Sequence, residues 1–242
     1  MGVLNRTPDS FSDGGRFIGL DQALAQIERM VDEGADILDV GGESTRPGSA
    51  GVDAQEELDR VLPLIEGIRG RFPTPISIDT SKPEVMQAAV AAGASMINDV
   101  YALRRPGALQ AAAAAGTALC LMHMQGEPRT MQKEPRYADV TQEVKEFLED
   151  RAQAALDAGI PRDCIVLDPG FGFGKNLEHN LTLLRRLPEL AALGHPILVG
   201  LSRKSMIGTL LGGKPMEERV QGSVAAAVIA VQNGASIVRV HD

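Results

Sequence analysis

The chain has 242 residues, 44% of them hydrophobic, which is enough to bury the core of a single domain over residues 1–242. Its formal net charge of −8 argues against a nucleic-acid or anionic-membrane binder, because both kinds of binding need clustered Lys and Arg. A signal-peptide pattern and apolar runs of about 18 residues are absent, and only two cysteines occur, so we expect a cytoplasmic protein without disulfides or a zinc site.

Short apolar runs alternate with helical patterns along the chain, which is typical of repeated βα units and a parallel sheet. We expect eight strands, at residues 2–5, 37–40, 76–79, 96–99, 118–122, 165–168, 197–201 and 237–240. Helices are predicted where apolar residues fall on one stripe. The clearest stripes are Leu58, Val61, Leu62, Ile65, Ile68 and Phe72, and then Val220, Val224, Val228 and Val231. Both stripes are expected to pack against the sheet.

Four glycines, Gly34, Gly93, Gly116 and Gly234, each close a predicted helix just before a strand, where glycine supplies a left-handed cap. The first strand lacks the following G-x-G-x-x-G of many open doubly wound sheets, which remain an alternative. We therefore expect an α/β fold of the closed (β/α)8 or TIM-barrel type. The sequence ends at Asp242, directly after the eighth strand, so the final helix is expected to be absent.

The active site of such a barrel lies at the carboxyl ends of its strands. Polar residues gather at these ends: Asn5, Asp79, Asn98, Asp99, His123, Asp168, Ser202, Arg203, Lys204, Arg239 and His241. Because burying such groups without partners is costly, this ring predicts a polar ligand or a mutual network.

Alternation along the last strand puts Arg239 and His241 on one face, expected to point to the barrel mouth. Asn5 ends the first strand, which closure of a barrel brings beside the eighth. These three residues predict an anion site, and the amide oxygen of Asn5 could also bind a magnesium ion that bridges phosphates.

Acceptor groups at three other strand ends, Asp79, Asn98 and Asp168, are expected to converge. A carboxylate accepts two parallel N–H bonds from a cyclic amidine or guanidine edge, as in pterins and guanines. Lys204, on the opposite side, could donate to a ring carbonyl and nitrogen. The pattern predicts a flat, nitrogen-rich heterocycle beside a phosphate site.

Loops complete the predicted barrel mouth. Segments 7–17 and 41–51 are rich in Gly, Ser and Pro and are expected to act as lids. DPGFGFGK does not have the spacing of a phosphate-binding P-loop and is interpreted as a tight loop that presents Phe171 and Phe173. His123 fits a packed histidine and a ligand contact equally well.

Several motifs in register resemble the dihydropteroate synthase family of bacterial folate biosynthesis, across essentially the whole chain. They are MGVLNRTPDSFSDGG, DVGGESTRPG, SIDTSKPEV, INDV, LMHMQG, LDPGFGFGKN, GLSRKSMIG and RVHD. The resemblance implies a magnesium-assisted transferase that joins a pterin diphosphate to p-aminobenzoate, and a homodimer in which the last helices take part. Sulfonamides would compete at the p-aminobenzoate pocket.

The resemblance also implies roles for individual residues. The pterin would contact Asp79, Asn98, Asp168 and Lys204, and the diphosphate with magnesium would contact Asn5, Arg239 and His241. The p-aminobenzoate pocket would be shaped by Phe11, Thr45, Arg46, Pro47, Phe173, Lys204 and Ser205. Catalysis would depend on Asp79, Lys204, Arg239 and His241.

Two departures from the family pattern keep alternatives open. Position 6 is Arg where the family usually has Val, and the customary lead-in and last helix are absent, which leaves homodimer formation open. A pterin-binding methyltransferase domain that serves a corrinoid protein is one alternative, although its substrate carries no diphosphate. A catalytically inactive pterin-binding module is the other.

Overall fold

The computed structural model describes residues 1–5, 15–44, 51–128 and 130–242, with the side chains of 15–18 excepted. Its strands are β1 (Gly2–Asn5), β2 (Leu38–Gly41), β3 (Ile76–Asp79), β4 (Met96–Asp99), β5 (Ala118–Met122), β6 (Ile165–Asp168), β7 (Leu198–Val199) and β8 (Ile237–Val238). The eight predicted strands are thus confirmed. The second begins one residue later than expected, and the last two are shorter.

The strands form a closed parallel barrel. Six of them pair in chain order from β1 to β6, and β7 pairs with β8. Isolated parallel bridges, Leu167 with Ile197 and Gly2 with Val240, join the two sheets on both sides. The α-amino group of Met1 adds a 3.0 Å bond to the Val238 carbonyl. Closure of the ring confirms the expected barrel over an open sheet.

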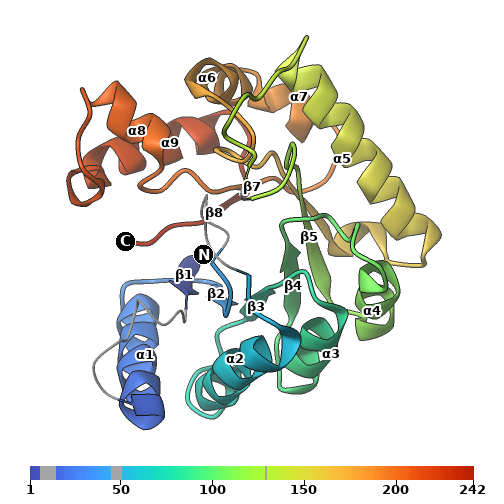
Figure 1. The fold of residues 1–242 in the computed structure, drawn as a ribbon, viewed down its shortest axis with the longest axis vertical. Helices are drawn as coiled ribbons and strands as arrows, with labels where there is room; N and C mark the ends of the chain where they lie inside the picture. Colours follow the sequence, from blue (N-terminus) through green and yellow to red (C-terminus); the bar gives the residue numbers. More distant parts are fainter. Residues whose placement is uncertain (6–14, 45–50, 129) are drawn as a thin grey trace.

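Helices surround the barrel on its outer face (Figure 1). They are α1 (Gly15–Asp32), α2 (Ala54–Arg69), α3 (Pro83–Ala91), α4 (Ala108–Ala115), α5 (Val140–Asp157), α6 (Leu177–Arg185), α7 (Leu187–Ala191), α8 (Ser205–Leu210) and α9 (Val220–Gln232). The four glycines predicted to cap helices all have positive φ, from 63° at Gly116 to 116° at Gly93. Within the described part of the chain, no helix is long and apolar enough to cross a membrane.

Two apolar layers hold the barrel together. The larger lies between strands and helices and includes Leu38, Ile65 and Ile78, all fully buried. The smaller, formed by Met96, Cys120, Val166 and Leu198 with Met1, Ala118 and Ile237, fills the barrel interior. Because side chains alternate along a strand, the next inward positions toward the carboxyl ends carry the polar residues.

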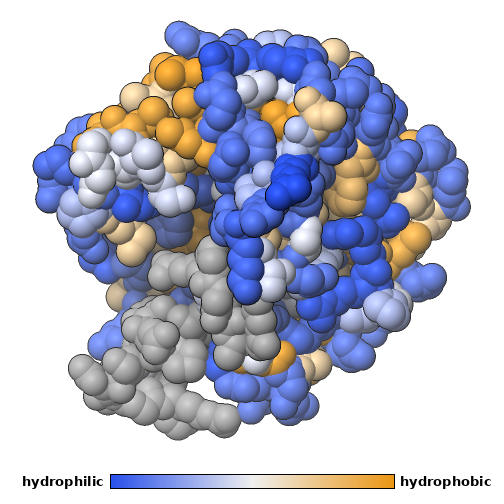
Figure 2. Space-filling view, turned by 45° about the horizontal axis from the view of Figure 1, so that its top comes forward, coloured by the Kyte–Doolittle hydropathy of each residue, from blue (hydrophilic) through white to orange (hydrophobic). Residues whose placement is uncertain are grey.

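The prediction for the last helix was wrong about which face covers the barrel. The buried residues of α9 are Ser223, Ala226 and Ala230, whereas Val224 is 59% and Val228 53% exposed. Small side chains let this helix lie close to the strands, and the valines point outward. With α8 they form an apolar surface, visible at the upper left of Figure 2.

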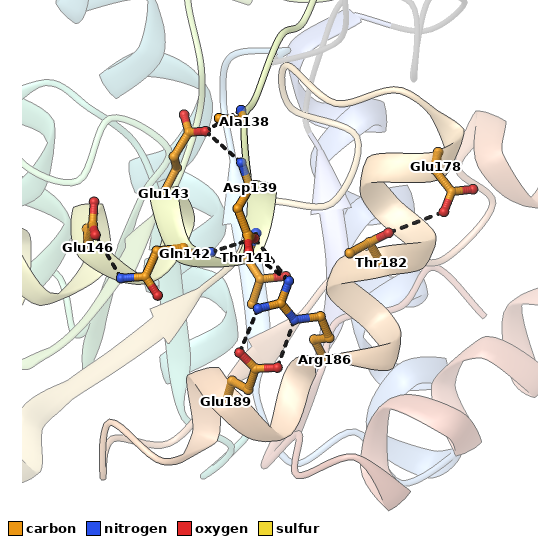
Figure 3. A network of polar contacts seen from close by, with 10 residues as sticks. All are labelled: Ala138, Asp139, Thr141, Gln142, Glu143, Glu146, Glu178, Thr182, Arg186 and Glu189. Atoms are coloured by element: carbon orange, nitrogen blue, oxygen red, sulfur yellow. Dashed lines mark hydrogen bonds and ion pairs between the residues drawn. The ribbon is translucent and has the colours of Figure 1, made fainter.

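A surface network joins the helices that flank β6. Arg186 donates to both carboxylate oxygens of Asp139 at 3.0 Å and pairs with Glu189 (Figure 3). Asp139 also caps α5 by accepting from the backbone N–H groups of Thr141 and Gln142. Backbone hydrogen bonds, first that from Gln142, and the Arg186 guanidinium lower the pKa of Asp139. The network fixes α5 against α7.

Candidate active site

Three charged residues meet inside the barrel near its carboxyl end. The guanidinium of Arg239 lies 2.7 Å from Asp39 through Nε and 2.9 Å from Asp79 through Nη2. Asp39 is fully buried in β2, and Asp79 is 8% exposed at the end of β3. These contacts put the Arg239 side chain on the inward face of its strand, as the alternation predicts.

One cation shared by two carboxylates leaves an excess of negative charge. Burial raises the pKa of Asp79 to about 8, and Asp39 adds to the rise, while Arg239 opposes it. The second terminal nitrogen of Arg239, Nη1, makes no hydrogen bond to the residues that the structure describes. The site therefore offers an anion-binding nitrogen beside a carboxyl group that is poised to gain or lose a proton.

Asp168 and Lys204 lie on the other side of the barrel mouth. Asp168 ends β6, is 6% exposed and accepts a 2.7 Å bond from the Gly170 amide. Lys204 precedes α8, donates to the Phe171 carbonyl, and holds its ammonium 4.6 Å from the centre of the Phe173 ring. Burial lowers the pKa of Lys204 to about 8, while Asp168 raises it.

Arg239 connects the two sides electrostatically. Its charge lowers the pKa of Asp79, of Asp168 and of Lys204, although burial has the largest effect on each. Asn98 of β4 is 4% exposed and pairs in register with Asp79. The structure therefore brings together the four residues expected around the heterocycle.

Asn5 and His241 occupy a neighbouring position. Gly41 makes room for Asn5, since a Cβ at Gly41 would lie 2.8 Å from Asn5 Oδ1 and 3.6 Å from the Cβ of Asp79. His241 contacts Ser202, three residues after β7, with 3.2 Å between Nδ1 and Oγ. Asn5 and His241 line one cavity of about 510 Å³ together with residues of β1 and α1, and none of the residues expected around the heterocycle lines it.

A second cavity, of about 300 Å³, opens beside Asp79. Its lining includes Glu43, Tyr101 and Arg105. Lys82 lies next to it and forms 2.5 Å ion pairs with Glu43 and with the buried Glu57. The mouth is therefore strongly polar on the side of the β2 and β3 loops.

Some predicted residues cannot be placed. Phe11, Thr45, Arg46 and Pro47, and also Arg6, lie outside the described residues. Ser205 is the exposed first residue of α8. Over residues 1–5, 15–44, 51–128 and 130–242, no group of three or more His, Cys, Asp or Glu side chains could hold a metal ion.

Comparison with known proteins places this geometry in a family. The model of the pterin binding enzyme family matches residues 1–241. The dihydropteroate synthase of Haemophilus influenzae is 53% identical over 242 residues, covering 100% of this chain and 88% of that protein. The chain belongs to the dihydropteroate synthase family.

Solved structures agree with this placement in the dihydropteroate synthase family. The Xanthomonas albilineans dihydropteroate synthase with 4-aminobenzoic acid superposes with a TM-score of 0.94 and is 54% identical, covering 100% of this chain and 86% of that one. The same organism's enzyme in complex with 7,8-dihydropteroate gives a TM-score of 0.90 at 51% identity, over 100% and 86% of the two chains. The family resemblance predicted from the motifs is confirmed, and with it the assignment to a family of transferases.

Two members of this dihydropteroate synthase site were missed by reasoning from strand ends. Asp39 stands in the middle of a strand rather than at its end, and the signal was a lone carboxylate within the apolar run ILDV. Lys175 ends the DPGFGFGK motif, which its spacing predicts only as a tight loop, yet this lysine is 2% exposed. His123, left open between two interpretations, is buried and packs edge-on against Phe147 at 4.9 Å.

Proposed function

We propose that the chain condenses 6-hydroxymethyl-7,8-dihydropterin diphosphate with p-aminobenzoate, giving 7,8-dihydropteroate and diphosphate. The observation that carries this proposal is the arrangement of Asp79, Asp168 and Lys204 around Arg239 in one barrel mouth. Relatives that are 53% and 54% identical are named dihydropteroate synthases and support it.

The pterin would be held by its nitrogen-rich edge. In the ionised state, Asp79 can accept two parallel N–H bonds from the amino-pyrimidine edge, and Asn98, its register partner, can bond to a ring nitrogen. Lys204 would donate from the opposite side, where the Phe171 carbonyl and the Phe173 ring already orient its ammonium. The ring plane would then lie across the mouth.

The diphosphate would lie toward β8 and β1. Asp39 and Asp79 hold the Arg239 guanidinium through Nε and Nη2, which leaves the N–H groups of Nη1 for a phosphate oxygen. His241 comes two residues after Arg239, and it lines a cavity beside β1 and α1 together with Asn5. The Asn5 amide oxygen lies beside Gly41 and is a ligand type that magnesium accepts when phosphate oxygens complete its shell. Magnesium bound there would supply charge neutralisation for the leaving diphosphate.

The reaction then needs little acid–base chemistry. The bond between the pterin methylene carbon and the diphosphate oxygen breaks, and its electron pair leaves with the diphosphate. Asp79 and Asp168 would stabilise the positive charge that spreads into the pterin ring. The amine of p-aminobenzoate, held by Phe173, Lys204 and Ser205, forms the new C–N bond and loses a proton to water.

An assay for diphosphate release tests the proposal directly. Mixing both substrates with magnesium should release one diphosphate per dihydropteroate formed, and omission of p-aminobenzoate should abolish sustained release. Arg239→Lys keeps the charge but loses the planar fork, so turnover should fall about 100-fold or more. Arg185→Lys, at an exposed ion pair on α6, is the matched control. Tight pterin binding without any turnover would instead support an inactive module.

We also propose a cytoplasmic homodimer. Its contact would be the apolar surface of Leu210, Leu211, Met216, Val224, Val228, Ile229 and Val231, all at least 40% exposed. Exposed apolar patches of this kind mark protein contacts in many soluble proteins. Sedimentation equilibrium should give a dimer that Val228→Lys converts to a monomer; a wild-type monomer at all concentrations would refute it.

A further inference from the structure

The loop that follows β6, residues 170–174, has an unusual backbone. Its glycines Gly170, Gly172 and Gly174 have φ values of 67°, 78° and 65°, so left-handed residues alternate with Phe171 and Phe173. Because of this alternation, the carbonyl groups do not form the regular backbone hydrogen bonds of a helix or a sheet. They therefore need partners from side chains.

Every carbonyl of this loop has such a partner. The donors are Lys175 Nζ to Gly170 at 3.0 Å and to Phe173 at 3.1 Å, Lys204 Nζ to Phe171, Gln132 Nε2 to Gly172, and Tyr137 Oη to Gly174 at 2.9 Å. Four side chains thus fix five consecutive carbonyls. Lys175 binds two of the five, and the Gly170 carbonyl also accepts from the Phe173 amide at 3.1 Å.

Lys175 lies beneath the loop and is 2% exposed. Its third contact is His123 Nδ1, at 2.8 Å, so with Nδ1 unprotonated the three hydrogens of the ammonium meet three acceptors. Burial lowers the pKa of Lys175 well below its ordinary value, while nearby Asp168 raises it. With all three hydrogens used within the protein, this lysine acts on its neighbours and not on a substrate.

The two carbonyls that Lys175 binds flank the one that binds Lys204. Gly170 comes directly before Phe171, and Phe173, whose ring lies 4.6 Å from the Lys204 ammonium, follows two residues later. The amide of Gly170 also donates to Asp168. The position of Lys204 and of the Phe173 ring therefore depends on the geometry that Lys175 imposes.

We infer that Lys175 is a positioning residue for the p-aminobenzoate side of the site: its ammonium fixes loop 170–174 so that the Phe171 carbonyl and the Phe173 ring hold Lys204 in place. The inference rests on the proposed function, since Phe173 and Lys204 are placed at p-aminobenzoate there. It adds a residue with no substrate contact of its own.

A double-mutant cycle separates positioning from general stability. Lys175→Met keeps the length and burial of the side chain and removes all three donors. It should raise KM for p-aminobenzoate about tenfold in the otherwise unchanged protein, and by a clearly smaller factor in a Phe173→Ala background, because one of the two groups that it positions, the Phe173 ring, is then missing. Equal increases in both backgrounds would overturn the inference.

Two controls address folding. Ile68→Ala, in the last turn of α2 at the opposite end of the barrel, destabilises the core and should leave KM unchanged. If Lys175→Met does not fold, Tyr137→Phe removes the neighbouring donor to Gly174. It should raise the same KM about threefold, again by a smaller factor when Phe173 is absent; an unchanged KM would count against the loop as the positioning element.

Hydrogen exchange tests the loop without turnover. Amides of residues 170–174 should exchange about tenfold faster in Lys175→Met than in the wild type, while those of β4 stay the same. Unchanged exchange would overturn the inference even in an active enzyme. Conversely, a wild type that releases no diphosphate would refute the proposed function and leave this structural result standing.

Discussion

Arg239, directly after β8, and Asp79 of β3 meet across the barrel, 2.9 Å apart between Nη2 and Oδ2, although 160 residues separate them in sequence. Asp39 accepts from the same guanidinium at 2.7 Å. The anion-binding and heterocycle-binding parts of the proposed site are therefore joined by one shared charge. A substitution in either part should therefore change ligand binding in the other.

Asp79→Asn should reduce turnover more than pterin binding. The amide keeps the shape and one acceptor but cannot offset the positive charge that develops on the ring. We expect kcat to fall about 100-fold and the pterin Kd to rise about tenfold or less. Steady-state kinetics and calorimetric titration measure the two quantities. Equal losses in both would mean that Asp79 only binds the pterin.

Pterin binding should release a proton. The raised pKa of Asp79, about 8, means that this carboxyl is mostly protonated in the free protein at pH 7. Accepting two N–H bonds requires the carboxylate, so binding lowers the pKa and expels close to one proton at that pH. Affinity should therefore weaken about tenfold per pH unit below 8. Titrations in buffers of different ionisation enthalpy measure the proton directly, and proton uptake would contradict the assignment.

Asp39→Asn should move this pH dependence. Asp39 raises the pKa of Asp79, and it also competes for Arg239, so its removal lowers the pKa of Asp79 on both counts. Pterin affinity at pH 7 should then increase and the proton released should decrease. Unfolding in urea should show a loss of about 1–3 kcal/mol, since a buried partner of Arg239 is lost.

The matched control for Asp39→Asn is Ser77→Ala, at the buried register neighbour of Asp39. Its hydroxyl oxygen has no hydrogen-bond partner within the described residues. In Ser77→Ala, the pH midpoint of pterin affinity should be the same as in the wild type. If Ser77→Ala shifts the midpoint as much as Asp39→Asn does, packing rather than charge is responsible.

Two glycines with nearly the same φ should respond very differently to alanine. A Cβ at Gly170 would overlap the His123 carbonyl, whereas at Gly116 nothing lies within 4 Å. Gly116→Ala should lose about 1–2 kcal/mol of unfolding free energy, from the left-handed backbone alone. Gly170→Ala should lose about 3 kcal/mol or more, because overpacking adds to it. Similar losses in urea unfolding would show that the loop can shift.

Much of the fold could be predicted from local patterns. Apolar runs of four or five residues gave the strands, and Gly34, Gly93, Gly116 and Gly234 marked helix ends, because left-handed caps are a local requirement. The outward stripe of α9 could not be predicted. A helix with valines on one face and small residues on the other packs by close approach, and the sequence alone does not say which face approaches.

The sequence by itself determined the family, the eight strands and the polar residues at their ends, since each depends on short-range order along the chain. Only the tertiary structure decided that Arg239 is shared by Asp39 and Asp79, and that Lys175 lies beneath the loop holding Lys204. The physical reason is that burial and Coulomb interaction depend on distance in space. Closure of the barrel brings β8 next to β1, and across its interior places β8 within reach of β2 and β3.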